Sequence, residues 1–378
     1  MGNYVPRLIS SQIEEASKYF PVIVITGPRQ SGKTSLCRHL YPDFHYVNLE
    51  HITTRTNALA DPVTFIESLG DKVIIDEVQN IPELLSMVQV RVDENKALRY
   101  VLTGSSNFSL LKTVTQSLAG RAALFTLLPF SFKEMSEGNL DHSIERLMWQ
   151  GQYPGVITDH IPPEIFYRNY YTTYVERDLR DLLNIKNLLA FDTFMRLLAS
   201  RVGSEFNASG MAREVGVTPK TISEWLSILT TSYIVFPLRP YFNNVSKQLT
   251  KMPKVYFYDT GLLCYLLSIA SPDKLDGHIM KGAVFENLAI CELLKNQYNH
   301  SLDPNLYFYR ERSGREIDAL LVTPDGIDLY EMKAGKVFKP DFKANMEHLK
   351  STIGNVRHTT VIYDGESFAP VSINIRQV

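Results

Sequence analysis

Residues 27–34 read G-P-R-Q-S-G-K-T, and this segment constrains the fold more than any other part of the chain. It follows an apolar, β-branched run at residues 21–26, which predicts a buried strand, and it precedes residues 35–40, which begin as a helix. A strand, a glycine-rich loop and a helix are the surroundings that a phosphate-binding loop requires. The sequence therefore predicts a doubly wound, parallel α/β sheet with this loop at the carboxyl end of a strand.

The loop residues are of the types that nucleotide binding needs. Glycines let successive amide N–H groups point at phosphate oxygens, and the start of the following helix adds partial positive charge. We expect Lys33 to reach the β- and γ-phosphates of ATP, and Thr34 to offer its hydroxyl to Mg²⁺. The predicted nucleotide contacts are Gly27, Pro28, Arg29, Gln30, Ser31, Gly32, Lys33, Thr34 and Ser35.

A second short apolar strand, residues 73–75, ends in two carboxylates. Ligands of open α/β sheets bind at the carboxyl ends of the strands. We therefore expect Asp76 to hold Mg²⁺ and Glu77 to act as the general base toward the attacking water. The other interpretation is a solvated acidic turn. A P-loop kinase is another class of protein that could carry such a loop. It would not need Glu77 here because its acceptor substrate supplies the nucleophile.

Two further features follow a third strand at residues 99–103. One of Ser105, Ser106 and Asn107 is expected to contact the γ-phosphate or the water, and Ser106 is included among the predicted nucleotide contacts. Arg121 follows a glycine, and an arginine supplied to the γ-phosphate of a neighbouring subunit stabilises transition-state charge. This interpretation predicts a homo-oligomer; the alternative is a surface or structural arginine.

Residues 1 to about 135 resemble the ATPase domain of a prokaryotic AAA+-like family in which a nuclease-like region follows. The resemblance rests on Y-V-P-R at residues 4–7, the phosphate-binding loop, I-I-D-E-V-Q, L-T-G-S-S, S-L-A-G-R and L-P-F-S, and it extends over nearly the whole chain. It implies ATP hydrolysis but leaves the biological task open.

Composition sets limits on location and partners. The 378 residues suggest two or three domains, and a net charge of −2 excludes a global basic field for nucleic acid. Three scattered cysteines and the absence of an apolar run of about 20 residues predict a cytoplasmic protein without a membrane partner.

We expect an AAA+-like ATPase domain at 1–150, a helical linker at 151–205, a winged helix-turn-helix at 206–260 and a nuclease-like domain at 261–378.

The predicted helix-turn-helix comprises helices at residues 209–215 and 219–229, followed by a wing-like strand at 233–238. Thr218 is a natural N-cap, and Pro219 suits the first helical position. The second helix would bind DNA in the functional interpretation. A structural or protein-contacting role is favoured, because its first half offers only Lys220 as a cation and Glu224 would repel phosphates.

The last hundred residues resemble the PD-(D/E)xK nuclease core. Asp318 lies in one predicted strand, and Glu331 and Lys333 lie in the next, on one face because they are two residues apart. The resemblance implies that Asp318 and Glu331 bind Mg²⁺ and that Lys333 acts in catalysis on water or phosphate. Glu286, on a preceding helix, matches an extra acidic residue of that fold. In this interpretation the chain couples ATP hydrolysis to the binding or processing of DNA or RNA. The alternative is an ATP-driven switch with a non-catalytic docking domain.

Overall fold

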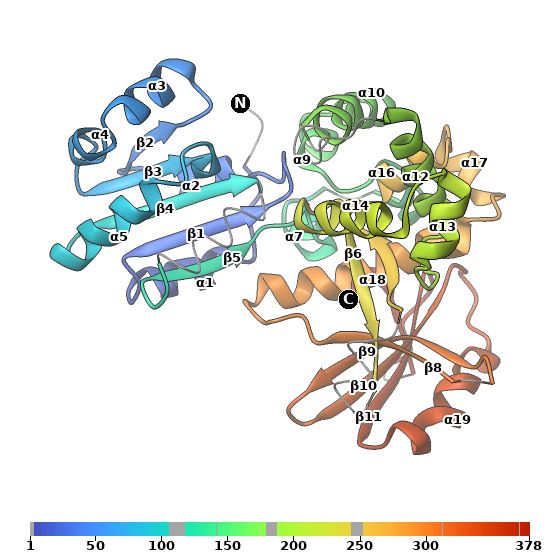
Figure 1. Cartoon of the computed structure of the whole chain (residues 1–378). Coiled ribbons are helices and arrows are strands. Elements are labelled where there is room, and N and C mark those ends of the chain that lie inside the picture. The colour runs from blue at the N-terminus through green and yellow to red at the C-terminus, as the bar shows by residue number, and fades with distance from the viewer. Residues whose placement is uncertain are drawn as a thin grey trace. The chain divides into compact units, whose positions relative to one another are not determined.

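The computed structural model describes residues 4–105, 118–140, 142–178 (side chains to 175), 187–242, 252–311, 313–369 and 371–378 (Figure 1). The chain divides into two compact units. The first comprises Met1–Phe130, Thr231–Tyr233 and Tyr298–Leu302; the second comprises Ser131–Thr230, Ile234–Gln297 and Asp303–Val378.

The first unit is built on five parallel strands in the order β2-β3-β4-β1-β5 (Figure 1). The strands are β1 (Val22–Gly27), β2 (His45–Asn48), β3 (Lys72–Asp76), β4 (Arg99–Ser105) and β5 (Ala122–Thr126). The helices are α1 (Ser10–Ser17), α2 (Lys33–Leu40), α3 (Ile52–Ala60), α4 (Pro62–Ser68), α5 (Leu84–Glu94) and a 3-10 turn at Val78–Asn80. The predicted parallel sheet and the helix after the loop are confirmed.

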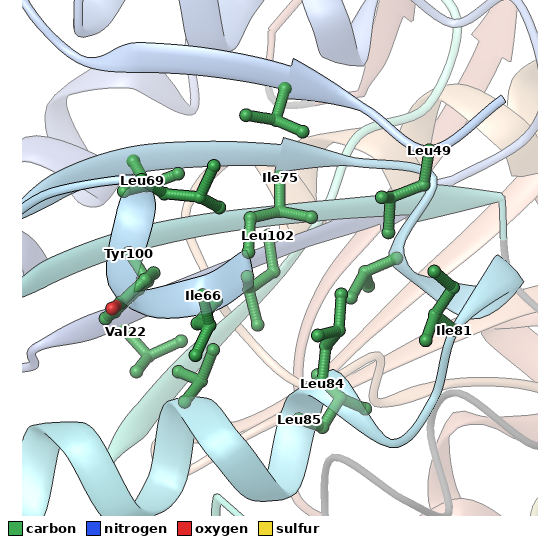
Figure 2. Packing of buried hydrophobic residues seen from close by; sticks show 14 of the residues in the cluster. Val22, Leu49, Ile66, Leu69, Ile75, Ile81, Leu84, Leu85, Tyr100 and Leu102 are labelled. Atoms are coloured by element: carbon green, nitrogen blue, oxygen red, sulfur yellow. The ribbon is translucent and has the colours of Figure 1, made fainter. Parts of the chain in front are cut away.

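Helices cover both faces of this sheet because the first four residues of β1 are apolar and buried. Alternate residues of a strand point to opposite faces. Val22 and Val24 belong to a buried cluster with α4 and α5, whereas Ile23 and Ile25 pack with α1 and α2. Figure 2 shows the first cluster, in which Leu84 and Leu85 lie beside the sheet. The six residues of β1 are all buried, which fixes the strand that carries the loop.

The second unit combines helices with a mixed sheet. The helices are α7 (Phe132–Glu137), α8 (Ile144–Gln150), α9 (Pro154–Ile157), α10 (Pro163–Tyr170), a π-helix at Tyr171–Asp178, α12 (Leu188–Ser200), α13 (Ala208–Val215), α14 (Pro219–Thr231), α16 (Thr260–Leu266), α17 (Pro272–Asp276), α18 (Lys281–Asn299) and α19 (Ala344–Ile353). Short 3-10 helices lie at Pro340–Lys343 and Ile375–Gln377.

The sheet of the second unit has seven strands in the order β12-β11-β10-β9-β8-β6-β7. They are β6 (Val235–Pro240), β7 (Lys254–Phe257), β8 (Leu306–Arg310), β9 (Glu316–Thr323), β10 (Gly326–Lys333), β11 (Val356–Tyr363) and β12 (Ser372–Asn374). The hairpin of β9 and β10 is antiparallel, and β10 and β11 are parallel. The predicted helix before the hairpin is α18, and the predicted hairpin strands are β9 and β10.

The predicted helix-turn-helix corresponds to α13 and α14. Gly216 adopts the left-handed conformation at the end of α13, and the Thr218 hydroxyl accepts the Thr221 N–H at 3.1 Å. The strand after it is not a separate wing, because β6 pairs with β7 on one edge and with β8 on the other. The seven-stranded sheet therefore crosses the predicted division between residues 206–260 and 261–378, since an apolar strand pattern does not specify its pairing partners.

Within the described parts of the chain, no helix combines the length and apolar composition that a membrane span requires.

Candidate functional site

The strand order of the first unit brings three sequence motifs to one edge. β4 lies between β1 and β3, and Gly27 at the end of β1 is level with Ser105 at the end of β4. Asp76 ends the neighbouring strand β3. Since all these strands run in parallel, the phosphate-binding loop, the two carboxylates and the polar end of β4 meet where α/β sheets bind ligands.

The loop uses backbone conformations that favour glycine. Gly27 has φ +145°, and a Cβ atom there would lie 2.1 Å from the carbonyl oxygen of Leu127. Gly32 has φ 96° and Gln30 has φ 62°, so the chain turns through the left-handed region twice more before α2 begins at Lys33. These turns place backbone amides and the helix N-terminus around one concave loop.

The ammonium group of Lys33 lies inside this loop. Its Nζ donates to the carbonyl oxygens of Gly27 at 3.0 Å and Pro28 at 2.8 Å, and the side chain is buried. Burial lowers the pKa of Lys33, and the negative charges of Glu77 and Asp76 partly oppose this shift. The cation therefore lies within the loop, close enough to both predicted acidic residues to feel their negative charge.

Asp76 is buried and accepts hydrogen bonds from three hydroxyl groups. Oδ2 accepts from Thr34 Oγ1 and from Tyr46, each at 2.7 Å, and Oδ1 accepts from Thr103. Burial and the contact with Asp76 raise the pKa of Tyr46. The Thr34 hydroxyl and the Asp76 carboxylate are hard oxygen donors already in contact, so this pair fits the ligand preference of Mg²⁺.

Glu77 lies directly after β3 in a left-handed conformation with φ 56°. Its Oε2 accepts a hydrogen bond from Gln79 Nε2, and it lies 3.4 Å from both the amide nitrogen and the hydroxyl oxygen of Ser105. Gln79 Nε2 also donates to Ser105 Oγ at 3.1 Å. Of the three polar residues predicted here, the structure brings Ser105 to Glu77; Ser106 and Asn107 lie outside the described residues.

Gln79 and Arg7 hold this site together, although sequence reasoning assigned no role to either. Arg7 donates to the carbonyl oxygen of Ser31 at 2.9 Å and to that of Leu128 at 2.6 Å, and its guanidinium lies 4.9 Å from the centre of the Phe130 ring. Arg7 therefore ties the phosphate-binding loop to the segment after β5. The joint presence of Y-V-P-R and L-P-F-S was the available signal, but sequence alone does not show that they touch.

Arg121 lies at the opposite end of the sheet. Its carbonyl oxygen accepts the N–H of Val22 at the start of β1, so the six residues of β1 separate it from the loop. That length is about 20 Å at the rise of a strand. The guanidinium makes two hydrogen bonds of 2.7 Å to the carboxylate of Asp93. This position argues against a role at the chain's own nucleotide site, and a role in a neighbour would require Arg121 to leave Asp93.

The second unit brings the predicted nuclease-like residues together at the hairpin of β9 and β10. Asp318 Oδ2 accepts the backbone N–H of Met332 at 2.7 Å, and Lys333 Nζ lies 2.6 Å from Glu331 Oε1. Burial raises the pKa of Asp318 well above its usual range, and the nearby carboxylates of Glu286 and Glu331 raise it further. The pKa of Glu331 is also raised by burial, against the effect of Lys333.

Three residues that the prediction did not include extend this acidic cluster, which we define as Glu286, Glu316, Asp318 and Glu331 with Lys254, Tyr256 and Lys333. Lys254 and Tyr256 come from β7, and Glu316 comes from β9. Glu331 Oε2 is buried without a hydrogen-bond partner. Across the described residues, however, no three His, Cys, Asp or Glu side chains are arranged as a metal-binding group.

Comparison with protein families defines the class of the first unit. Residues 19–136 match the AAA domain family. Residues 141–273 and 281–377 match two families described as domains of unknown function, DUF8612 and DUF4143. Together with the parallel sheet and the loop, the first match supports a P-loop ATPase domain of the AAA type.

The whole chain also matches curated proteins. It is 30% identical over 373 residues to the uncharacterized proteins Rv2008c of Mycobacterium tuberculosis and Mb2031c of Mycobacterium bovis, covering 97% of this chain and 81% of each relative. The chain belongs to the family of these mycobacterial proteins. The uncharacterized protein MJ1544 of Methanocaldococcus jannaschii is 22% identical over 412 residues, covering 98% of this chain and 88% of its own.

Among solved structures, the Walker-type ATPase paby2304 of Pyrococcus abyssi is similar to this chain. The two are 17% identical, the match covers 68% of this chain and 94% of that one, and the TM-score is 0.41.

Proposed function

We propose that the first unit binds ATP and hydrolyses it in a reaction that depends on Mg²⁺. The observation that carries this proposal is the hydrogen bond of 2.7 Å between Thr34 Oγ1 and Asp76 Oδ2, which joins the start of α2 to the end of β3. The contact supports a shared metal site, because it joins two hard oxygen donors that adjoin Lys33 and Glu77 in the sequence. The match of residues 19–136 to the AAA domain family supports the same assignment.

In this proposal the loop amides and the N-terminus of α2 bind the phosphates, and Lys33 balances charge on the β- and γ-phosphates. Thr34 and Asp76 hold Mg²⁺, which neutralises phosphate charge when bound. Glu77 takes a proton from water as the water oxygen bonds to the γ-phosphorus. The bond from that phosphorus to the bridging oxygen of ADP breaks, so the products are ADP and inorganic phosphate. Ser105 and Gln79 orient the Glu77 carboxylate.

A product analysis under single-turnover conditions tests this proposal. The full chain is mixed with ATP labelled on its γ-phosphate, with Mg²⁺ or with EDTA. The expected result is release of equal amounts of ADP and inorganic phosphate in the presence of Mg²⁺ and no release in the presence of EDTA. Tight ATP binding without any phosphate release would leave only a nucleotide-binding switch, and label transferred to an added acceptor would indicate a kinase.

The acidic cluster supports a second candidate function, cleavage of DNA or RNA phosphodiester bonds with a divalent cation. The observation that favours it concerns Glu331. Its side chain is only 7% exposed, and its Oε2 is buried without a hydrogen-bond partner. In this proposal Asp318 and Glu331 hold Mg²⁺, and Lys333 acts on the water or on phosphate charge. ATP hydrolysis in the first unit would then be coupled to work on nucleic acid.

The rival proposal is an ATP-driven switch whose second unit is a docking module. Two observations support it: the described residues contain no metal-binding group of three acidic, His or Cys side chains, and exposed Lys220 on α14 lies 3.9 Å from Glu224, which reduces its attraction for phosphates. The ATPase rate with and without DNA or RNA separates the two. Stimulation by nucleic acid supports coupling, whereas an unchanged rate supports the switch.

A further inference from the structure

Lys254 reaches the acidic cluster from β7, outside the hairpin that carries Asp318 and Glu331. Its side chain is 3% exposed, and its Nζ lies 3.3 Å from Glu286 Oε1 and in contact with Glu316 Oε1. Burial by itself would lower the pKa of Lys254, but the attraction of Glu286 and Glu316 outweighs burial and raises that pKa above its usual value. Lys254 is therefore a fixed positive charge inside the cluster.

The same contacts hold Glu286 in place. Its Oε1 accepts a hydrogen bond of 2.6 Å from the Tyr256 hydroxyl in addition to the ion pair with Lys254. A Cβ atom on Gly203 would lie only 3.2 Å from this oxygen, so the surrounding backbone is also close. Glu286 Oε1 is thus fully engaged by protein groups, and the carboxylate has little freedom to turn toward another ligand.

The hairpin side of the cluster differs, because Glu331 Oε2 there is buried without a partner beside Asp318. If all four carboxylates of the cluster are ionised, as binding of a cation requires, they exceed the two ammonium groups of Lys254 and Lys333 by two negative charges. Arg310 also lies 3.6 Å from Glu316, but at a more exposed rim. One divalent cation at the hairpin would balance the buried charges.

We propose that Lys254 acts as a built-in cation, so that the cluster takes a single divalent cation at Asp318 and Glu331. Glu286 is then a positioning residue that is held by Lys254 and Tyr256, not a ligand. This inference rests on the second candidate function, in which the cluster binds a cation. A site with Lys254 in place has no room for a second divalent cation between Glu286 and Glu316, because the ammonium occupies that position.

A Mn²⁺ titration followed by electron paramagnetic resonance tests this inference without any activity measurement. The full chain carries Asp76→Asn to remove the nucleotide site, and no nucleotide is added. The expected result is one bound ion, which Asp318→Asn abolishes and which Glu286→Gln weakens, through loss of a nearby negative charge, but does not abolish. Lys254→Met removes a nearby positive charge, so it is expected to tighten Mn²⁺ binding by roughly tenfold or more or to admit a second ion.

Control variants separate a charge effect from damage to the fold. Lys254→Arg keeps the charge and is expected to keep one ion, and Lys220→Met removes an exposed lysine and is expected to change nothing. Should Lys254→Met fail to fold, Lys254→Met combined with Glu286→Gln restores the charge balance and is expected to bind one ion.

Two outcomes would overturn the inference but leave the cation site standing. One is two bound ions in the protein that keeps Lys254; the other is a Lys254→Met variant that binds one ion no more tightly. If the protein that keeps Lys254 binds no ion, both the inference and the second candidate function are overturned.

Discussion

Replacing Glu77 by glutamine is expected to stop ATP hydrolysis while leaving ATP binding intact. The side chain keeps its size, and its amide oxygen can still accept from Gln79 Nε2 and from the Ser105 amide, so the turn after β3 is retained. The amide cannot take a proton from water. Loss of a general base typically slows the chemical step by ~10²–10⁴-fold, which is about 3–5 kcal/mol in activation free energy.

Binding and chemistry are measured separately to test this prediction. Equilibrium binding of a fluorescent ATP analogue reports affinity, and single-turnover phosphate release reports the chemical step. Asp76, Thr34 and Lys33 are unchanged in the variant, so affinity is expected to stay within a few-fold of the unsubstituted protein. Glu83→Gln, which neutralises a nearby exposed carboxylate at the start of α5, is the matched control and is expected to hydrolyse ATP normally. A normal single-turnover rate in Glu77→Gln would refute the assignment of the base.

The other predictions follow from individual contacts. Gly27→Ala is expected to weaken ATP binding at least tenfold, because its Cβ would lie 2.1 Å from the Leu127 carbonyl oxygen; Gly70→Ala, also at positive φ but with open space, is the control, and equal effects would contradict the argument. Arg121→Ala is expected to leave the hydrolysis rate unchanged because its partner is Asp93; a slower rate, rescued by mixing with Glu77→Gln protein, would instead support the arginine acting on a neighbouring subunit. Lys333→Ala is expected to keep Mn²⁺ binding but to abolish any metal-dependent cleavage of DNA or RNA, and product formed by this variant would exclude its catalytic role.

The fold around the nucleotide site could be predicted because local sequence determines it. The β-branched runs of β1 and β3 are buried on both faces, and the glycine loop with its helix allows few other arrangements. The hairpin with Asp318 and Glu331 was predicted for a similar reason, since alternation in a strand fixes which side chains share a face.

The contacts that the sequence did not reveal are those between distant segments. Arg7 and Leu128 are far apart in the chain and meet only because β5, which precedes Leu128, pairs with β1 in the sheet. Lys254 joins the acidic cluster because β7 pairs with β6, and no local pattern specifies that pairing. The prediction for Arg121 relied on a glycine-arginine pattern, and such a pattern does not show at which end of a strand the residue lies.

Phosphate release from ATP by the protein and by its Lys33→Ala variant tests the central claim most directly. The ammonium of Lys33 lies inside the loop and feels the negative charge of Asp76 and Glu77, so its removal is expected to abolish ATP binding and Mg²⁺-dependent hydrolysis in a protein that is still folded. Circular dichroism and thermal unfolding verify the fold of the variant. A correctly folded Lys33→Ala protein that releases phosphate at the rate of the unsubstituted protein would contradict the assignment of this loop as the nucleotide site.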